Sequence, residues 1–164
     1  MIPQENRGKL PEMGMPLQQK PPDDPGRRGA VAVVVRDGRM LVIRRSRTVV
    51  APLTVCFPGG GIEGAESEEE ALIREFREEV GVTLRPVRRL WRCMTPWKVQ
   101  LAWWLGELKP DAVPAANHAE VESIHWVTPA EMAQMPGLLE SNREFLELVQ
   151  RGQIDLGCGG NAEW

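Results

Sequence analysis

A triple glycine followed by an acidic segment is the feature that most constrains this chain. Residues 59–61 are all glycine, and the segment 67–80 begins at Ser67, a good N-cap residue, and stops at Gly81. Ser67 and Glu70 have the spacing of a capping box, and glycine readily takes the left-handed conformation that ends helices. The pattern predicts a helix over residues 67–80, after a loop whose backbone can approach a phosphate or a metal closely.

The predicted helix carries an apolar face and a neighbouring acidic face. At about 100° per residue, the side chains on the apolar arc are Leu72, Ile73, Phe76 and Val80. The side chains on the adjacent arc are Glu75, Glu78 and Glu79. Three like charges at this spacing repel one another, and the repulsion grows where burial lowers the dielectric constant. A divalent cation would turn the repulsion into attraction, because carboxylate oxygens are the ligands that Mg²⁺ prefers.

A plainer interpretation is a solvated acidic face that Arg74 and Arg77 neutralise. Two observations favour a metal site instead: the glutamates border the apolar arc rather than oppose it, and the helix follows the triple glycine. Helix geometry by itself leaves the two interpretations open.

The stretch over residues 60–82 resembles a known signature. Its spacing is G-x5-E-x7-R-E-U-x-E-E-x-G-U, where U is a bulky apolar residue, and every fixed position is met, from Gly60 and Glu66 to Gly81 and Val82. This is the signature of the Nudix hydrolase family, whose members are MutT-like enzymes. The preceding Phe-Pro-Gly-Gly at 57–60 is also similar to that family, and a looser resemblance covers residues 29–150.

The resemblance implies a set of metal ligands. Glu75, Glu78 and Glu79 would hold divalent ions, usually Mg²⁺ or Mn²⁺, and Gly60 would offer a backbone carbonyl oxygen. Members of the family often add a carboxylate from a loop shortly before the last strand. Glu120 lies at that place in this sequence.

The resemblance also implies roles around the metal. Glu122 is the alternative to Glu120, Arg74 would orient one of the glutamates through an ion pair, and Glu66 would fix the loop and the helix. We expect the catalytic residues to be Glu75, Glu78, Glu120 and Arg74. Glu75 or Glu120 is the expected general base, with Glu78 next.

The reaction implied by the resemblance is metal-dependent hydrolysis of a phosphoanhydride bond in a nucleoside diphosphate linked to another group. A small nucleotide, such as an ordinary or oxidised nucleoside triphosphate, is the expected substrate. ADP-ribose, dinucleoside polyphosphates and capped RNA ends are alternatives. A nucleotide-binding module without catalysis, or an isomerase of isoprenoid diphosphates on the same fold, would be a different class of protein.

Residues outside the helix are candidates for substrate binding. The expected set is Arg44, Arg45, Gly59, Gly60 and Trp97. Arginines suit phosphate geometry, although these two also fit a solvated strand end. Trp97 follows a proline in a predicted turn, where its ring would stack on a base.

The remaining sequence predicts an α/β (α+β) domain with a mixed β-sheet between α-helices, which the resemblance identifies as the Nudix fold. Strands are expected at 30–35, 40–43, 55–57, 84–93, 100–107 and 121–127, and further helices at 129–135 and 138–150. Asp37-Gly38 marks a hairpin turn, and the adjacent Trp103 and Trp104 should point to opposite faces of the sheet. Residues 1–28 read as a flexible proline-rich arm, 29–151 as the domain and 152–164 as a flexible tail.

The charge and the cysteine content limit the kinds of partner and the compartment that we expect. The chain has 164 residues and a formal net charge of -3, which does not suit a sequence-independent nucleic-acid binder. The three cysteines, Cys56, Cys93 and Cys158, fit no zinc motif and predict reduced thiols in a cytoplasmic protein. We expect a small nucleotide partner, neither a membrane nor a sequence-specific nucleic acid, and a monomer or a homodimer.

Overall fold

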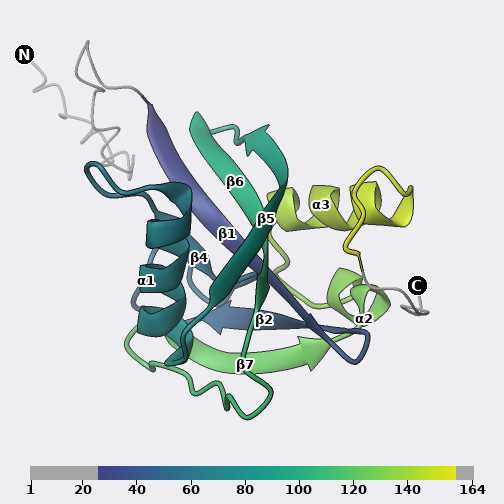
Figure 1. The fold of residues 1–164 in the computed structure, drawn as a ribbon, viewed down its shortest axis with the longest axis horizontal. Helices are drawn as coiled ribbons and strands as arrows, with labels where there is room; N and C mark the ends of the chain where they lie inside the picture. Colours follow the sequence, from purple (N-terminus) through teal and green to yellow (C-terminus); the bar gives the residue numbers. More distant parts are fainter. Residues whose placement is uncertain (1–25, 158–164) are drawn as a thin grey trace, which may run out of the picture.

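The computed structural model describes residues 26–157 (Figure 1). In this part of the chain there are seven strands: β1 (Arg27–Arg36), β2 (Arg39–Arg45), β3 (Val55–Cys56), β4 (Gly59–Gly61), β5 (Arg85–Met94), β6 (Val99–Glu107) and β7 (Val121–Val127). The helices are α1 (Glu68–Val80), α2 (Pro129–Ala133) and α3 (Glu140–Gln150). None of these helices has the length and apolar character needed to cross a membrane.

The strands form one mixed sheet, as predicted. Its order is β3-β2-β1-β6-β5, with β4 also paired to β1 and β7 also paired to β2. The pairing of β1 with β6 is parallel, whereas the other strand pairs are antiparallel. Helix α1 lies on one side of the sheet, and α2 and α3 lie on the other (Figure 1). The predicted α+β class is therefore confirmed.

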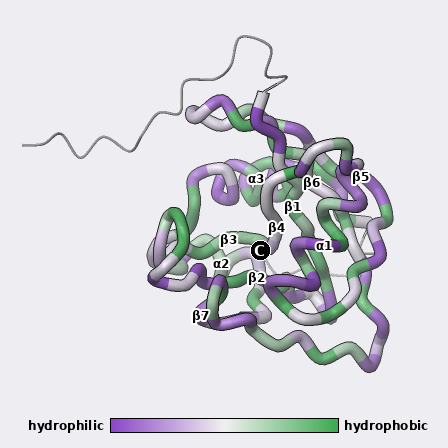
Figure 2. Tube along the Cα trace, turned by 90° about the vertical axis from the view of Figure 1, so that its left-hand side faces the viewer, coloured by the Kyte–Doolittle hydropathy of each residue, from purple (hydrophilic) through white to green (hydrophobic). Residues whose placement is uncertain are grey.

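Strand β1 is the centre of the sheet because it is apolar on both faces. Its residues 29–34 are all buried, which is the pattern of a strand covered on both sides. Figure 2 shows this hydrophobic stretch running through the interior. At the end of β1, Asp37 and Gly38 have φ angles of 51° and 71°, the left-handed pair that the predicted hairpin turn requires.

The core has two apolar clusters, one on each side of the sheet. The cluster beneath α3 contains Trp103, whose ring stacks on Phe145 with centroids 4.7 Å apart. The cluster beneath α1 contains Leu72 and Phe76, and Trp104 packs against it. The prediction that the two adjacent tryptophans point to opposite faces is confirmed.

The triple glycine forms a short strand where the sequence predicts a loop. Gly59 pairs with Val31 and Gly60 pairs with Ala30, so β4 lies directly against the centre of the sheet. A Cβ atom at Gly59 would lie 2.2 Å from the carbonyl oxygen of Ala30, which is too close for any side chain. Glycine is therefore required at Gly59 for β4 to lie against β1.

The fold extends beyond both predicted domain boundaries. Strand β1 begins at Arg27, inside the predicted arm, because its first residues pair with β6. Ile154 and Leu156, inside the predicted tail, are 6% and 9% exposed and belong to the cluster beneath α3. The glycine-rich composition of this segment predicted a flexible tail in spite of this apolar pair. Residues 1–25 and 158–164, Cys158 among them, lie outside the described residues.

Replacing Ile154 tests this packing. Ile154→Ala should lower the free energy of unfolding by about 2–5 kcal/mol, because it removes buried methyl groups and leaves a cavity. Urea denaturation measures the difference. Gln153→Ala is the matched control, since Gln153 is exposed. Equal stabilities of the two variants would show that the segment after α3 does not pack on the core.

Candidate active site

Helix α1 has the ends that the sequence predicts. The Ser67 side chain accepts a hydrogen bond from the Glu70 backbone, the Glu70 side chain accepts one from the Ser67 backbone, and both together close the capping box. Gly81 ends the helix with φ 71° and donates its N–H to the Arg77 carbonyl. The buried side of the helix includes Glu79. Both ends are thus fixed, and the acidic face is held at the edge of the core.

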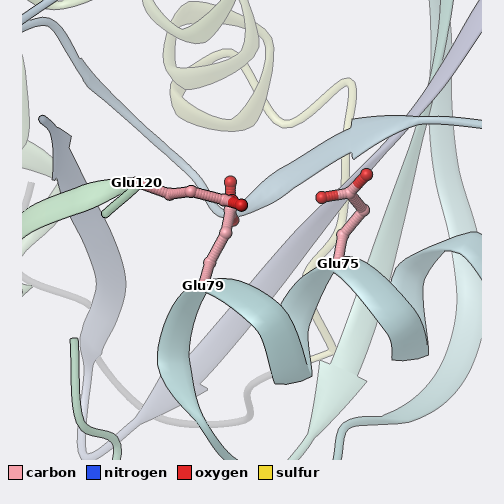
Figure 3. A group of neighbouring side chains, drawn as sticks. All are labelled: Glu75, Glu79 and Glu120. Carbon is pink, nitrogen blue, oxygen red and sulfur yellow. The ribbon is translucent and has the colours of Figure 1, made fainter. Parts of the chain in front are cut away.

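Three carboxylates from two elements meet beside α1. Glu75 and Glu79 lie one turn apart on the helix, and Glu120 reaches them from the residue before β7 (Figure 3). One carboxylate oxygen from each lies within 4.8 Å of the others. This group unites two of the three helical glutamates expected as ligands with the expected loop glutamate.

Glu79 is the most buried member of the group, with 4% of its surface exposed. Its Oε2 accepts a hydrogen bond from the Gly59 N–H at 3.0 Å. Burial raises the pKa of Glu79 to about 8, and the charges of Glu75 and Glu120 add to the rise, while the Gly59 hydrogen bond opposes it. In the absence of a cation, this carboxyl group therefore holds its proton at neutral pH.

Glu75 lies against the glycine strand. A Cβ atom at Gly60 would lie 2.3 Å from the Glu75 Cδ, so the carboxylate occupies the space that any other residue would fill. Burial raises the pKa of Glu75, although the Arg74 guanidinium, 2.8 Å from Glu75 Oε1, opposes the rise. Gly60 thus lies beside the ligand group as expected, and its missing side chain makes room for Glu75.

The loop before β7 fixes Glu120. The Glu120 carbonyl accepts a hydrogen bond from the N–H of Ser46, a buried residue that follows β2. Asn117 donates its N–H to the Glu79 carbonyl, and its own carbonyl accepts from the Glu120 N–H. Glu120 is therefore attached both to the end of β2 and to the last turn of α1.

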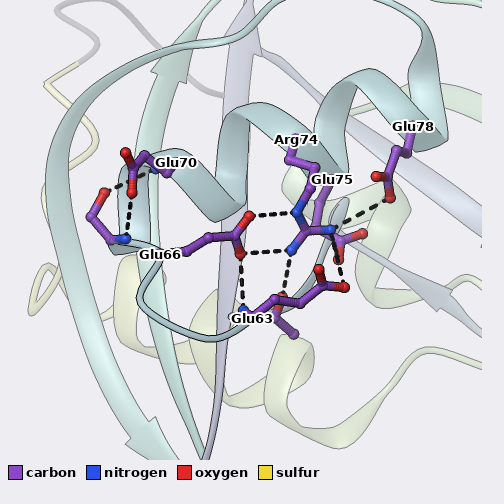
Figure 4. Close-up of polar contacts among 8 residues, drawn as sticks. Glu63, Glu66, Glu70, Arg74, Glu75 and Glu78 are labelled. Carbon is purple, nitrogen blue, oxygen red and sulfur yellow. Dashed lines mark hydrogen bonds and ion pairs between the residues drawn. The ribbon is translucent and has the colours of Figure 1, made fainter.

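Arg74 organises the other side of the acidic face (Figure 4). Its guanidinium makes two hydrogen bonds to Glu66, of 2.6 and 2.9 Å, and one to the Gly61 carbonyl. The Arg74 hydrogen bonds are the main cause that lowers the pKa of Glu66 to about 2. Arg74 therefore ties the loop, the glycine strand and Glu75 together, as the sequence predicts for an orienting residue.

Glu78 points toward Arg74, 3.5 Å from Nη1, and lies outside the three-carboxylate group (Figure 4). Its role as a ligand stays a prediction. Glu122, the alternative to Glu120, faces Arg47 at 3.9 Å and also lies outside this group.

The donor set fits a hard divalent cation. Three carboxylates that crowd within 4.8 Å, one of them buried, are unfavourable when ionised together. Mg²⁺ and Mn²⁺ bind carboxylate oxygens, and such an ion would offset the repulsion. Glu75, Glu79 and Glu120 are the residues that would hold it.

A cavity of about 260 Å³ opens beside the glycine strand. Residues of β1, β4 and β6 line it on one side, and the start of α3 closes it on the other. Its polar lining includes Arg45, Ser141 and Asn142, and its apolar lining includes Phe57 and Leu101. A cavity with an apolar wall and a few polar groups is typical of a small-molecule site.

The two predicted phosphate-binding arginines lie in different surroundings. Arg45 lines the cavity, and its charge acts to lower the pKa of Glu79. Arg44 is the next residue on the strand and donates to the carbonyls of Leu53 and Pro136 instead. Arg44 therefore joins two loops, and it is not among the residues that line the cavity.

Sequence reasoning missed Arg27, Arg28 and Asn142 in the cavity wall. Asn142 is 3% exposed, and its Oδ1 accepts the Phe57 N–H at 2.9 Å. A signal was present, because Asn142 shares the apolar face of its helix with Phe145 and Leu146, where a polar residue needs a partner. The two arginines fell within the segment interpreted as a flexible arm.

A family model described as "NUDIX domain" matches residues 26–149. The chain is 32% identical over 115 residues to the NAD-capped RNA hydrolase NudC of Deinococcus radiodurans, and the match covers 68% of this chain and 39% of NudC. The chain thus spans well under half the length of that relative.

Two further relatives match over most of their own length. The chain is 30% identical over 109 residues to the CTP pyrophosphohydrolase of Escherichia coli (strain K12), a match that covers 64% of this chain and 78% of that protein. The crystal structure of a MutT NUDIX hydrolase from Burkholderia pseudomallei superposes with a TM-score of 0.62 at 26% identity, over 75% of this chain and 97% of that one.

The raised pKa of Glu79 predicts a pH-dependent stability in EDTA. The folded protein keeps the Glu79 proton up to pH of about 8, whereas an ordinary glutamate loses it near 4.5. The stability that this proton contributes is full below pH 4.5 and is lost as the pH rises to about 8. Glu79→Gln should therefore gain stability relative to the wild type between pH 5 and pH 8.

Urea denaturation at the two pH values measures the gain, and Glu69→Gln on the same helix is the control. A Glu79→Gln difference that is the same at pH 5 and pH 8 would contradict the raised pKa.

The space beside Gly60 gives a second test. Gly60→Ala should weaken Mn²⁺ binding by about 10- to 100-fold, because its methyl group displaces the Glu75 carboxylate. Isothermal titration with Mn²⁺ measures the affinity. Gly61→Ala is the matched control, since a Cβ atom at Gly61 meets no atom within 4 Å. Equal Mn²⁺ affinities of the two variants would show that the Glu75 position is not needed for the ion.

Proposed function

Because the chain belongs to the Nudix family, we propose that it hydrolyses a phosphoanhydride bond in a nucleoside diphosphate linked to another group, with Mg²⁺ or Mn²⁺ as its cofactor. The observation that carries this proposal is the meeting of Glu75, Glu79 and Glu120 beside the glycine strand and the cavity. The names of two relatives, which refer to NAD-capped RNA and to CTP, support a nucleotide substrate.

The reaction needs neutralised phosphate charge, a positioned water and a base. Divalent ions bound to the carboxylates would supply Lewis acidity toward the phosphate oxygens and lower the pKa of a nearby water. The oxygen of that water forms a bond to phosphorus, the bridging P–O bond breaks, and a carboxylate takes the water proton. The products are two phosphorylated fragments.

The residues of the chain divide this work between them. Arg45, on the cavity wall next to Glu79, contacts the diphosphate. Arg74 holds Glu75 in place through its 2.8 Å hydrogen bond. Glu120 makes no side-chain hydrogen bond or ion pair with the described residues, so one of its oxygens would hold the ion while the other takes the proton, and we assign it the role of base.

The cavity holds the nucleoside. Its volume of about 260 Å³ is slightly below the roughly 300–1,000 Å³ of most drug-sized pockets, so it suits one nucleoside rather than two. The half-buried Leu101 offers apolar surface to a base and Ser141 offers a polar group, while the buried Phe57 and Asn142 complete the wall. The diphosphate then extends past the glycine strand toward the carboxylates.

Replacing single carboxylates tests the proposal. With Mg²⁺ and a panel of nucleoside triphosphates, ADP-ribose and dinucleoside polyphosphates, the wild type should release product. Glu75→Gln, Glu79→Gln and Glu120→Gln should each lower kcat/KM by about 10²-fold or more, because each removes a charge needed for the ion or the proton.

Glu69→Gln on α1 serves as the control, since Glu69 lies outside the group. Wild-type rates in all three variants would overturn the assignment. Binding of nucleotides by the wild type without any hydrolysis would favour a regulatory module.

A further inference from the structure

The turn between β5 and β6 exposes a large aromatic side chain at one end of the sheet. Trp97 is 69% exposed and Met94 is 63% exposed. The other tryptophans of residues 26–157 are buried or half-buried in the core. Exposing a ring of this size to water is unfavourable, so contact with a partner would stabilise it.

Hydrogen bonds define the backbone of the turn that carries Trp97. The Thr95 N–H donates to the Val99 carbonyl at 2.9 Å, and the Lys98 N–H donates to the Thr95 carbonyl at 2.9 Å. The Val99 N–H also donates to the Thr95 Oγ1 at 3.1 Å. Three hydrogen bonds within five residues make this tip preorganised for binding.

Positive charge lies beside the tip. Because β6 runs parallel to β1, Val99 is paired with Arg27, and both strands begin at the end of the sheet where the tip lies (Figure 1). Arg27 and Arg28 are exposed and make no side-chain hydrogen bond or ion pair among residues 26–157, whereas every other arginine there makes one. Lys98 adds a third exposed cation.

This surface adjoins the cavity at the end away from the carboxylates. Arg27, Arg28 and Val99 are part of the cavity lining. Glu75 lies against Gly60, which pairs with Ala30, and Arg27 precedes Ala30 by three residues, or about 10 Å along the strand. A nucleoside in the cavity therefore has the carboxylates at one end and the cations with Trp97 at the other.

We propose that Arg27, Trp97 and Lys98 bind the second nucleotide of an RNA whose 5′-polyphosphate end is the substrate, because Arg27 shares its face of β1 with Val31, another residue of the cavity lining. This inference rests on the proposed function. The first nucleoside occupies the cavity with its 5′-phosphates toward the carboxylates, the following phosphate contacts Arg27, and the second base stacks on Trp97. In a dinucleoside polyphosphate, the second nucleoside would instead leave from the carboxylate end.

The test compares nucleoside triphosphates with 5′-triphosphorylated RNA trinucleotides that begin with the same nucleotide. With Mg²⁺, the wild type should show a kcat/KM about 10-fold higher for the trinucleotide. Trp97→Ala and Arg27→Ala should each reduce this ratio to near one, and Trp97→Phe should preserve it. Val113→Ala, another exposed apolar residue, is the control and should leave the ratio unchanged.

Arg27→Ala should also flatten the salt dependence of trinucleotide KM, because it removes a phosphate contact. A wild-type ratio near one would overturn the proposal. The proposal would also fail if both alanine variants kept the ratio within twofold of the wild-type value. A similar Trp97-dependent preference for dinucleoside polyphosphates would overturn the assignment to RNA.

A second measurement separates this inference from the hydrolase proposal. RNA trinucleotides with a 5′-monophosphate contain no phosphoanhydride bond, so their binding can be titrated without turnover. Tighter binding of the trinucleotide than of the nucleoside monophosphate, lost in Trp97→Ala, would support the RNA surface even if no substrate were hydrolysed. Hydrolysis of nucleoside triphosphates without this preference would leave the proposed function in place and reject the surface.

Discussion

The contact between β4 and α1 is the constraint on which the candidate site depends. A strand of three glycines lies against β1, and because Gly60 has no side chain, the Glu75 carboxylate of the helix reaches the backbone. Glu79 accepts a hydrogen bond from Gly59, and Glu75 fills the space beside Gly60. The same contact buries the Glu75 and Glu79 carboxyl groups and raises their pKa values. A cation is therefore the natural partner of these carboxylates.

Local features were predictable because their causes are local. Capping at Ser67, termination at Gly81 and the spacing of the glutamates depend on residues within a few turns of one another, and the structure reproduces all three. The alternation of Trp103 and Trp104 across the sheet follows from strand geometry alone. The order of strands and helices along the chain predicted the mixed sheet, whereas family resemblance singled out Glu120, which local patterns would not have found.

Features that depend on contacts between residues far apart in the chain could not be predicted from the sequence. Gly59–Gly61 became a strand only because β1 lies beside it, and composition suggested a loop. Arg27 belongs to the sheet through its pairing with Val99, far along the chain, although its neighbours looked like a flexible arm. Asn142 accepts a hydrogen bond from the Phe57 N–H. The local periodicity of the sequence cannot show that these two residues lie close together.

The loop between β6 and β7 closes the open end of α1. Ala115 and Asn117 donate to the carbonyls of Val80 and Glu79, which belong to the groups that a helix leaves without partners at its end. Fraying of that last turn would release the loop as well, so Glu79 and Glu120 would leave the site together. Retention of an ion is therefore cooperative with local folding of this junction, and a bound ion would in turn slow its opening.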